Sequence, residues 1–400
     1  MRKTGRKARR EEMSPGRIEY IEAARQRLYN RRLRRTALLV ALVAAVVIYL
    51  TGVVNTSIMA LEDLTDTVRI ALMPEQGFPQ QTGAGEVYQA EQLGGSFVVL
   101  GSEGCTVFAD SGARLNTVGA GYARPALAAG GNSFVLYSRS GSELRVESRT
   151  RELYTRQTAG HIYLCALSDG GELAVATDDV RKLALLTVYD AAREELLTWS
   201  LTTAEGVPMR MAFSPDGTQL AVATLTAQGG AVVSNLYLLN LRAGEPQLLA
   251  AEAGSTPLEL VWQSNARLLA VYDSHAALYG SDGGARARRD FGGAQTAAVA
   301  AENGSLAVLF GDGPSSGVLL TDGELNVRYE GAVPSAHGIA CGADAFYLLC
   351  DSSVECFGLD GVYRWSCPLD ARPQALLAGE GLYVFAGNLV QRITPPEEEG

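Results

Sequence analysis

The residue types that most often carry out reactions are few in this chain of 400 residues and widely separated. Its three histidines, His161, His275 and His337, are far apart, and no H-x-x-x-H or C-x-x-C spacing of a zinc site occurs. We interpret them as isolated surface or loop residues. The sequence therefore predicts no catalytic residue, no cofactor and no metal site, and whether the chain is an enzyme stays uncertain.

Six cysteines could instead form disulfides. Cys105 and Cys165 fall in separate repeats, whereas Cys341, Cys350, Cys356 and Cys367 belong to one. Outside a membrane pairing is chemically permitted, and Cys350 and Cys356 flank one expected hairpin. The alternative is that all six are small apolar core residues, as free cysteine often is.

Acidic residues recur at one position of the repeating pattern described below, the turn after each long apolar strand. Such turns lie on one face of a ring of repeats and would make that face negative. It could dock a basic partner, or these residues could simply favour turns and be solvated there. The candidate partner face consists of Glu103, Asp178, Asp179, Asp273, Asp312 and Asp351.

The elements that position these residues are short apolar runs, too short for helices and rich in Val, Leu, Phe and Tyr. Eight such runs start 36 to 48 residues apart, and a second run follows each of them. A turn and a third strand then follow, and a segment of small residues precedes each unit. The eight first runs begin at Ser96, Ser133, Glu172, Gln219, Arg267, Ser305, Ala345 and Gly381.

Four strands in each unit of about 40 residues are typical of a β-propeller blade. We therefore predict an all-β fold, an eight-bladed β-propeller over residues 86–394, with seven blades as the alternative. The longer third and fourth spacings predict extended hairpins in blades three and four. Trp199 and Trp365 are expected on outer strands, and Trp262 on an inner strand.

Two stretches resemble known propeller repeats. MAFSPDGTQLAVAT, from Met211, resembles the repeats of WD-repeat and TolB-type propellers, and GLDGVYRWSCPL, from Gly358, resembles quinoprotein-like (PQQ-like) repeats. The layout as a whole is similar to an uncharacterised family of membrane-anchored propellers in Gram-positive bacteria. This resemblance implies a fold and an anchor but no known activity.

The N-terminal part has the features of a membrane anchor. Residues 1–35 hold thirteen basic and four acidic side chains, net +9, whereas the remaining residues carry net −19. Residues 36–54 contain no charge and are long enough to cross a bilayer of roughly 30 Å. The positive-inside rule puts the basic tail in the cytoplasm and the propeller outside. A cleaved signal peptide, ending near Ala60, is the alternative.

The basic tail suggests contact with the membrane rather than with nucleic acid, because no folded reading element accompanies it. Part of it could lie as a helix on the anionic inner leaflet, or it could be a solvated topology signal. Residues 55–85 are expected to form a stalk, and residues 395–400 an acidic tail.

Blade eight lacks an outer strand at its C-terminal end, because Pro395 and Pro396 follow its third strand. We predict that Thr67–Met73, or a nearby segment before Glu86, pairs with Leu389–Thr394 to close the ring. The predicted function is a membrane-anchored, extracytoplasmic binding or scaffold module that docks an envelope protein or wall component. The alternative is a ligand-sensing or enzymatic propeller that uses its axial channel.

Overall fold

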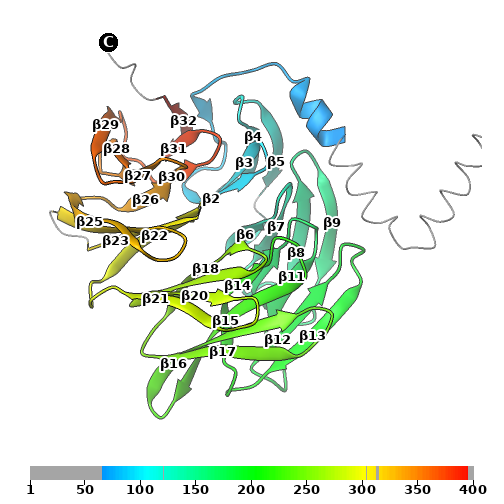
Figure 1. Ribbon diagram of the computed structural model, residues 1–400. Helices are drawn as coiled ribbons and strands as arrows, with labels where there is room; N and C mark the ends of the chain where they lie inside the picture. Colours follow the sequence, from blue (N-terminus) through cyan, green and yellow to red (C-terminus); the bar gives the residue numbers. More distant parts are fainter. Residues whose placement is uncertain (1–64, 120, 303, 312–314, 395–400) are drawn as a thin grey trace, which may run out of the picture. The chain divides into compact units, whose positions relative to one another are not determined.

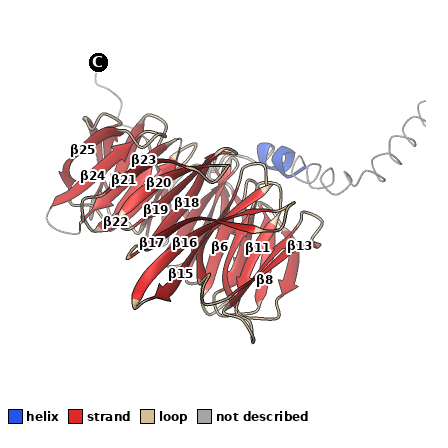
Figure 2. Cartoon of the chain, turned by 60° about the horizontal axis from the view of Figure 1, so that its bottom comes forward, coloured by secondary structure: helices blue, strands red, loops and turns tan. Residues whose placement is uncertain are grey.

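The computed structural model describes residues 65–119, 121–302, 304–311 and 315–394, which fold into eight four-stranded antiparallel sheets. Strands make up nearly all secondary structure in this part of the chain (Figure 2). The predicted cytoplasmic tail, transmembrane helix and acidic tail, at 1–35, 36–54 and 395–400, lie outside the described residues. No helix within the described ranges is long and apolar enough to cross a membrane.

Blades 1 to 4 each take four consecutive strands, ordered from the inner to the outer edge of the sheet. The strands of blades 1 and 2 are β2 (Val87–Leu93), β3 (Ser96–Gly101), β4 (Gly104–Ala109), β5 (Arg114–Gly119), β6 (Pro125–Ala129), β7 (Ser133–Ser138), β8 (Glu143–Ser148) and β9 (Glu152–Gln157). Those of blades 3 and 4 are β10 (Ile162–Leu167), β11 (Leu173–Thr177), β12 (Ala184–Tyr189), β13 (Glu195–Leu201), β14 (Val207–Phe213), β15 (Gln219–Gln228), β16 (Ala231–Asn240) and β17 (Pro246–Ala253).

Blades 5 to 7 repeat this order, and blade 8 combines three C-terminal strands with β1 from the N-terminal side. The strands of blades 5 and 6 are β18 (Pro257–Ser264), β19 (Arg267–Tyr272), β20 (His275–Gly280), β21 (Ala285–Asp290), β22 (Thr296–Glu302), β23 (Ser305–Phe310), β24 (Ser315–Thr321) and β25 (Val327–Pro334). Those of blades 7 and 8 are β26 (Gly338–Cys341), β27 (Ala345–Leu349), β28 (Ser353–Gly358), β29 (Tyr363–Pro368), β30 (Ala375–Ala378), β31 (Leu382–Ala386), β32 (Leu389–Ile393) and β1 (Gln80–Gln81).

The innermost strands form a closed ring. Each of β2, β6, β10, β14, β18, β22, β26 and β30 contacts the inner strand of the next blade, and β30 contacts β2 (Figure 1). Several of these strands are rich in small residues, as β6 (PALAA) and β22 (TAAVAAE) illustrate, because side chains crowd where eight strands approach one axis. The eight-bladed prediction is confirmed, and the seven-bladed alternative is wrong.

The apolar core is divided into eight clusters, one at each seam between neighbouring blades. The second strand of a blade contributes side chains to the clusters on both sides of the blade, because successive side chains point to opposite faces of a sheet. In β15, Leu220 and Val222 pack toward blade 3, whereas Ala221 and Ala223 pack toward blade 5. This two-sided burial explains why the second strands are continuous apolar runs.

The chain closes the ring between its two ends, as predicted, but with a different segment. Gln80 pairs with Val390 and Gln81 with Leu389, so the closing strand is β1. The segment 67–73 was the wrong choice: residues 65–71 are helical. Its alternating apolar side chains do not face a sheet, since Val68 and Leu72 are exposed by 52% and 80%.

This short helix is held against the blades by polar contacts. Thr150 donates a hydrogen bond from Oγ1 to Asp66 at 2.7 Å, and the Arg149 guanidinium donates to Thr67 at 2.7 Å and to the Gly94 carbonyl at 2.8 Å. Gly94 and Arg149 lie in turns after a first and a third strand. The chain therefore enters the propeller at the face opposite the turns between second and third strands.

Blade 4 has the longest strands. Its hairpin β15–β16 pairs over ten residues on each side, which confirms the extended hairpin predicted there. In blade 3 the corresponding strands are short, and the extra residues form the loop 178–183 instead. Trp199 and Trp365 lie on outer strands β13 and β29, and Trp262 on inner strand β18, as predicted.

Candidate functional site

The predicted acidic residues lie in the loops between second and third strands. Glu103 follows β3, Asp178 and Asp179 follow β11, Asp273 follows β19, and Asp351 follows β27. Antiparallel order puts these loops and the links between blades on one face, which we call the acidic face. Asp312 belongs to the equivalent loop of blade 6 but lies outside the described residues.

Asp178 is the most strongly engaged of these residues. Its carboxylate accepts hydrogen bonds from the His161 backbone N–H at 2.5 Å and contacts His161 Nδ1 at 2.8 Å. The hydrogen bond from the His161 side chain, together with the backbone bond, lowers the pKa of Asp178. His161 is itself 64% exposed, so this pair presents an imidazole and a carboxylate to solvent.

The other acids differ in the hydrogen bonds and ion pairs that their carboxylates form with nearby residues. Asp179 accepts hydrogen bonds from the N–H groups of Arg181 and Lys182, and Asp273 accepts one from the N–H of Thr256. Asp351 forms an exposed ion pair with Arg372 at 3.1 Å. These contacts satisfy part of each carboxylate, and the remaining lone pairs face solvent.

A cavity of about 460 Å³ opens beside Asp178, between blades 2 and 3. Its walls combine the 157–161 link, the 178–180 loop, Tyr189 and Glu195. Val180, at its rim, is fully exposed, although valine is usually buried. The acidic face thus carries a concave site with an apolar contact, an imidazole and several carboxylates.

Two further exposed apolar residues lie at this face, and the sequence analysis missed them. Tyr88, near the start of β2, is 56% exposed, and Val232, near the tip of the blade 4 hairpin, is 50% exposed. Tyrosine is enriched at protein interfaces. The sequence could have indicated both, because each is an apolar residue at the end of a strand, where no core position calls for an apolar side chain.

The innermost strands hold a second group of acids that the sequence analysis also missed: Glu91 on β2, Glu259 on β18 and Glu302 on β22. Burial raises the pKa of Glu91, and burial together with the Glu91 charge raises the pKa of Glu259 and of Glu302 to about 7. Both side chains of Glu259 and Glu302 are nevertheless exposed to solvent, although the surrounding protein desolvates their carboxyl groups. Of the three, Glu302 alone had a signal in the sequence, a glutamate at the end of a strand of small residues, TAAVAAE.

The residues considered for chemistry do not converge. His161, His275 and His337 belong to blades 3, 5 and 7, and His275 is fully buried against Tyr272 rather than at the surface. Within the described ranges, no three His, Cys, Asp or Glu side chains are arranged to hold a metal ion. All six cysteines are unpaired, so no bridge joins Cys350 to Cys356.

Burial accounts for the state of these thiols. Five of the six cysteines are buried, and burial raises the pKa of Cys341 to about 12 and that of Cys356 to about 11. The thiolate is the reactive form, so these side chains behave as core residues. Residues 313–317 have the G-x-S-x-G spacing of a nucleophilic serine, but they do not form a nucleophile elbow. Ser315 begins strand β24, whereas the serine of a nucleophile elbow is followed by a helix.

Comparisons with known proteins agree with the fold. Residues 77–320, more than half of the chain, match the model of DUF5711, a family of unknown function. No curated protein matches the sequence. Solved structures with a similar fold include BamB from Moraxella catarrhalis, at 12% identity and a TM-score of 0.53, covering 79% of this chain and 98% of that one.

Two eukaryotic structures are similar to the same degree. The WD40 domain of SCAP from fission yeast has 11% identity and a TM-score of 0.55, with 80% of this chain and 99% of that one covered. Chaetomium thermophilum Sqt1, bound to the N-terminus of ribosomal protein L10, has 12% identity and a TM-score of 0.52, with 79% and 98% covered. At such identities the likeness establishes the β-propeller fold alone.

Proposed function

The chain belongs to the DUF5711 family of unknown function. We propose that its propeller is a binding module that docks a basic partner on the acidic face. One observation carries this proposal: the cavity between blades 2 and 3, where Asp178, Asp179 and His161 surround the exposed Val180. An apolar contact ringed by charge is the usual composition of a protein docking site.

The way the chain enters the propeller supports this choice of face. The helix at 65–71 contacts turns on the opposite face, so this helix does not cover the acidic face. The net charge of −19 over residues 36–400 would attract a cationic partner, and salt would weaken that attraction.

We further propose that residues 36–54 anchor the propeller in a membrane, with residues 1–35 in the cytoplasm and the propeller outside. The charge difference between the two parts of the sequence supports this arrangement. A partner would then be an envelope protein or a wall component, at the outer surface of a Gram-positive cell.

The docking proposal is tested by replacing Asp178, Asp179, Asp273, Asp312 and Asp351 with Asn. Cross-linking on intact cells should capture less partner, with a larger loss at low salt, because charge attraction is least screened there. Thermal unfolding should change little, since exposed charges contribute little to stability and Asn still accepts the turn hydrogen bonds.

A matched control changes as many exposed acids on the opposite face: Asp169, Glu194, Glu245, Glu324 and Asp360 to their amides. It should capture partner as the unmodified chain does. Equal capture by both variants, or an equal loss in both, would show that the acidic face is not where the partner docks.

The topology is tested separately, by adding protease to wall-stripped cells. The propeller should be digested and the N-terminal tail protected. Protection of the C-terminus with loss of the tail would reverse the orientation, and release of the whole propeller without protease would favour a cleaved signal peptide.

The axial channel supports a second candidate function, a sensor of protons or small cations. Burial and the Glu91 charge raise the pKa of Glu259 and of Glu302 to about 7, although Arg210 lowers that of Glu259. Dialysis against a labelled polyamine tests it: binding that survives in the acidic-face variant but is lost in Glu259→Gln would favour the channel over the acidic face.

A further inference from the structure

Blade 8 has an incomplete outer edge. The outer strands of the other seven blades have six to eight residues, whereas β1 has two and pairs only with Leu389 and Val390 of β32. Thr82 donates its N–H to the Asn388 carbonyl. In an antiparallel ladder every second residue turns its backbone N–H and C=O toward the same neighbouring strand. After Asn388, the residues that face this edge are therefore Val390 and Arg392. No strand of the described chain pairs with Arg392 on that side.

The route of the chain explains the gap. The N–H groups of Gln76 and Gly77 bond to the Ser111 carbonyl of blade 1, at 3.2 and 2.9 Å. The Phe78 ring then inserts at the seam, 5.4 Å from Tyr383 and 6.3 Å from Phe97 between ring centroids. The chain therefore reaches blade 8 only at Gln80, and the edge of β32 beyond Val390 stays open.

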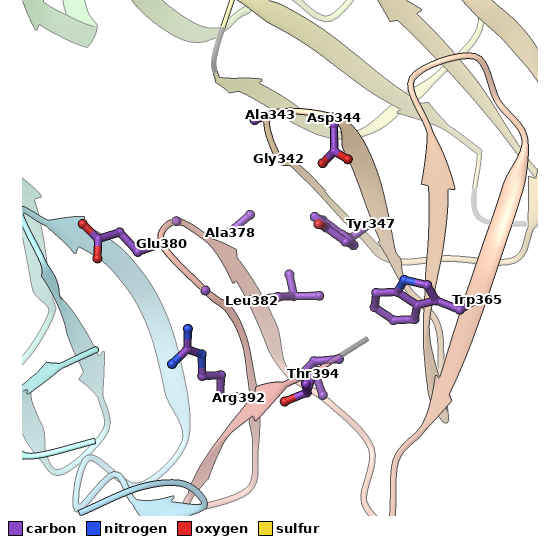
Figure 3. Close-up of a pocket in the computed structure, with 13 residues that line it drawn as sticks. Gly342, Ala343, Asp344, Tyr347, Trp365, Ala378, Glu380, Leu382, Arg392 and Thr394 are labelled. Carbon is purple, nitrogen blue, oxygen red and sulfur yellow. The ribbon is translucent and has the colours of Figure 1, made fainter. Parts of the chain in front are cut away.

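A cavity of about 560 Å³ adjoins this open edge, between blades 7 and 8 (Figure 3). Tyr347 and Trp365 of blade 7 lie on one side of it, and Leu382 of blade 8 lies across from them. Residues 392–394, at the end of β32, also line it, and so do residues 342–344 and 378–381, which include Asp344 and Glu380. The open backbone edge and the aromatic cavity are thus parts of one surface.

Carboxyl groups also flank the edge toward blade 1. Tyr383 donates a hydrogen bond to Asp110 Oδ1 at 2.9 Å, while Asp110 Oδ2 is buried without a hydrogen-bond partner in the described chain. Burial raises the pKa of Asp110 most, the nearby Glu380 carboxylate raises it further, and the nearby Arg392 guanidinium lowers it. Two carboxyl groups, Asp110 and Glu380, therefore lie close together on this side of the edge.

We propose that an extended segment of a partner protein adds a strand to the open edge of β32 and completes blade 8. Alternate side chains of an added strand point to opposite sides. One apolar side chain would fill the cavity formed by Tyr347, Trp365 and Leu382, and a neighbouring lysine or arginine would lie toward Asp110 and Glu380. This site lies on a different face from the acidic face and does not depend on it.

Hydrogen exchange on the folded protein tests the pairing directly. A short peptide of alternating valine and lysine is the ligand, and the same peptide with glutamate for lysine is its control. The Arg392 amide should exchange quickly in the free protein and slow down with the lysine peptide. The Val390 amide, already bonded to β1, should be protected throughout. The glutamate peptide should bind at least several-fold more weakly.

Substitutions separate the parts of the site. Arg392→Pro removes the edge donor and should weaken peptide binding about tenfold or more, the effect of one or two main-chain hydrogen bonds. Arg392→Ala keeps the backbone and should not weaken it. Glu380→Gln should reduce binding of the lysine peptide, whereas Glu330→Gln, an exposed carboxylate on β25 paired with Arg289, should not.

Several results would overturn the proposal. Protection of the Arg392 amide in the free, dilute protein would mean that the chain covers its own edge. Protection that appears only as protein concentration rises would identify a second copy as the occupant. Equal affinity for both peptides, or no protection by either, would reject a basic strand. The exchange measurement needs no variant, so it decides the question even if Arg392→Pro fails to fold.

Discussion

Blades 4 and 8 both have four antiparallel strands, but the strands of blade 4 are consecutive in the sequence, whereas those of blade 8 come from both ends of the propeller. Blade 4 uses one continuous stretch, and its central hairpin pairs over ten residues on each strand. Blade 8 joins the two ends of the propeller, and its closing strand contributes two paired residues. Pairing across more than 300 residues costs loop-closure entropy that a hairpin does not, so blade 8 depends on side-chain packing at the seam with blade 1.

Removing the closing segment should have the largest effect. A chain beginning at Gly85 lacks β1 and Phe78, whereas one beginning at Leu61 keeps both. The shorter chain should unfold at a clearly lower temperature and be less soluble, because its ring is unlatched and β32 is exposed along its whole edge. Equal melting temperatures in a calorimetric scan would mean that blade 8 needs no closure.

A single substitution sharpens the same comparison. Phe78→Ala should destabilise the propeller, by less than the about 3 to 5 kcal/mol of a fully buried phenylalanine, since Phe78 is only half-buried. Denaturant unfolding measures the loss. Val68→Ala, in the exposed helix, is the control and should be nearly neutral. A larger loss for Val68→Ala would place the latch in the helix instead.

The smallest effect concerns Glu259 and Glu302 on the inner strands β18 and β22. Glu259 and Glu302 have folded-state pKa values of about 7, above their ordinary 4.5, so the folded state binds protons more readily than the unfolded state. Their effect therefore lowers stability as pH rises from about 5 to about 8. The double Gln variant should melt slightly higher than the unmodified chain near pH 8 and show no such gain near pH 5.

These expectations rest on features that the sequence revealed to different degrees. The apolar runs predicted eight blades, because each second strand is buried at two seams and must be apolar throughout. The Pro395–Pro396 pair predicted that blade 8 lacks its own outer strand. Of the two closing segments considered, Thr67–Met73 was wrong, since Val68, Ile70 and Leu72 alternate like a strand but meet no sheet edge. The alternative, a nearby segment before Glu86, was right, because β1 lies at Gln80–Gln81.

The candidate sites were less predictable. The loop positions of Asp178, Asp179, Asp273 and Asp351 followed from the repeat. What surrounds them did not, because His161 reaches Asp178 only through the link into blade 3. The Glu91, Glu259 and Glu302 group could not be recognised, since a strand pattern does not tell which inner side chains point to the axis.

By itself, the sequence determined the repeat, the number of blades and the faces on which the acidic loops lie, since strand alternation and turn chemistry are local properties. Only the tertiary structure decided how the ring closes, which inner-strand glutamates acquire raised pKa values, and that β32 keeps an open edge beside a cavity that holds Tyr347 and Trp365. These features depend on contacts between residues hundreds of positions apart, such as Phe78 against Tyr383 and Gln80 against Val390. The local pattern of apolar and polar residues does not show which of several similar segments will form such a contact.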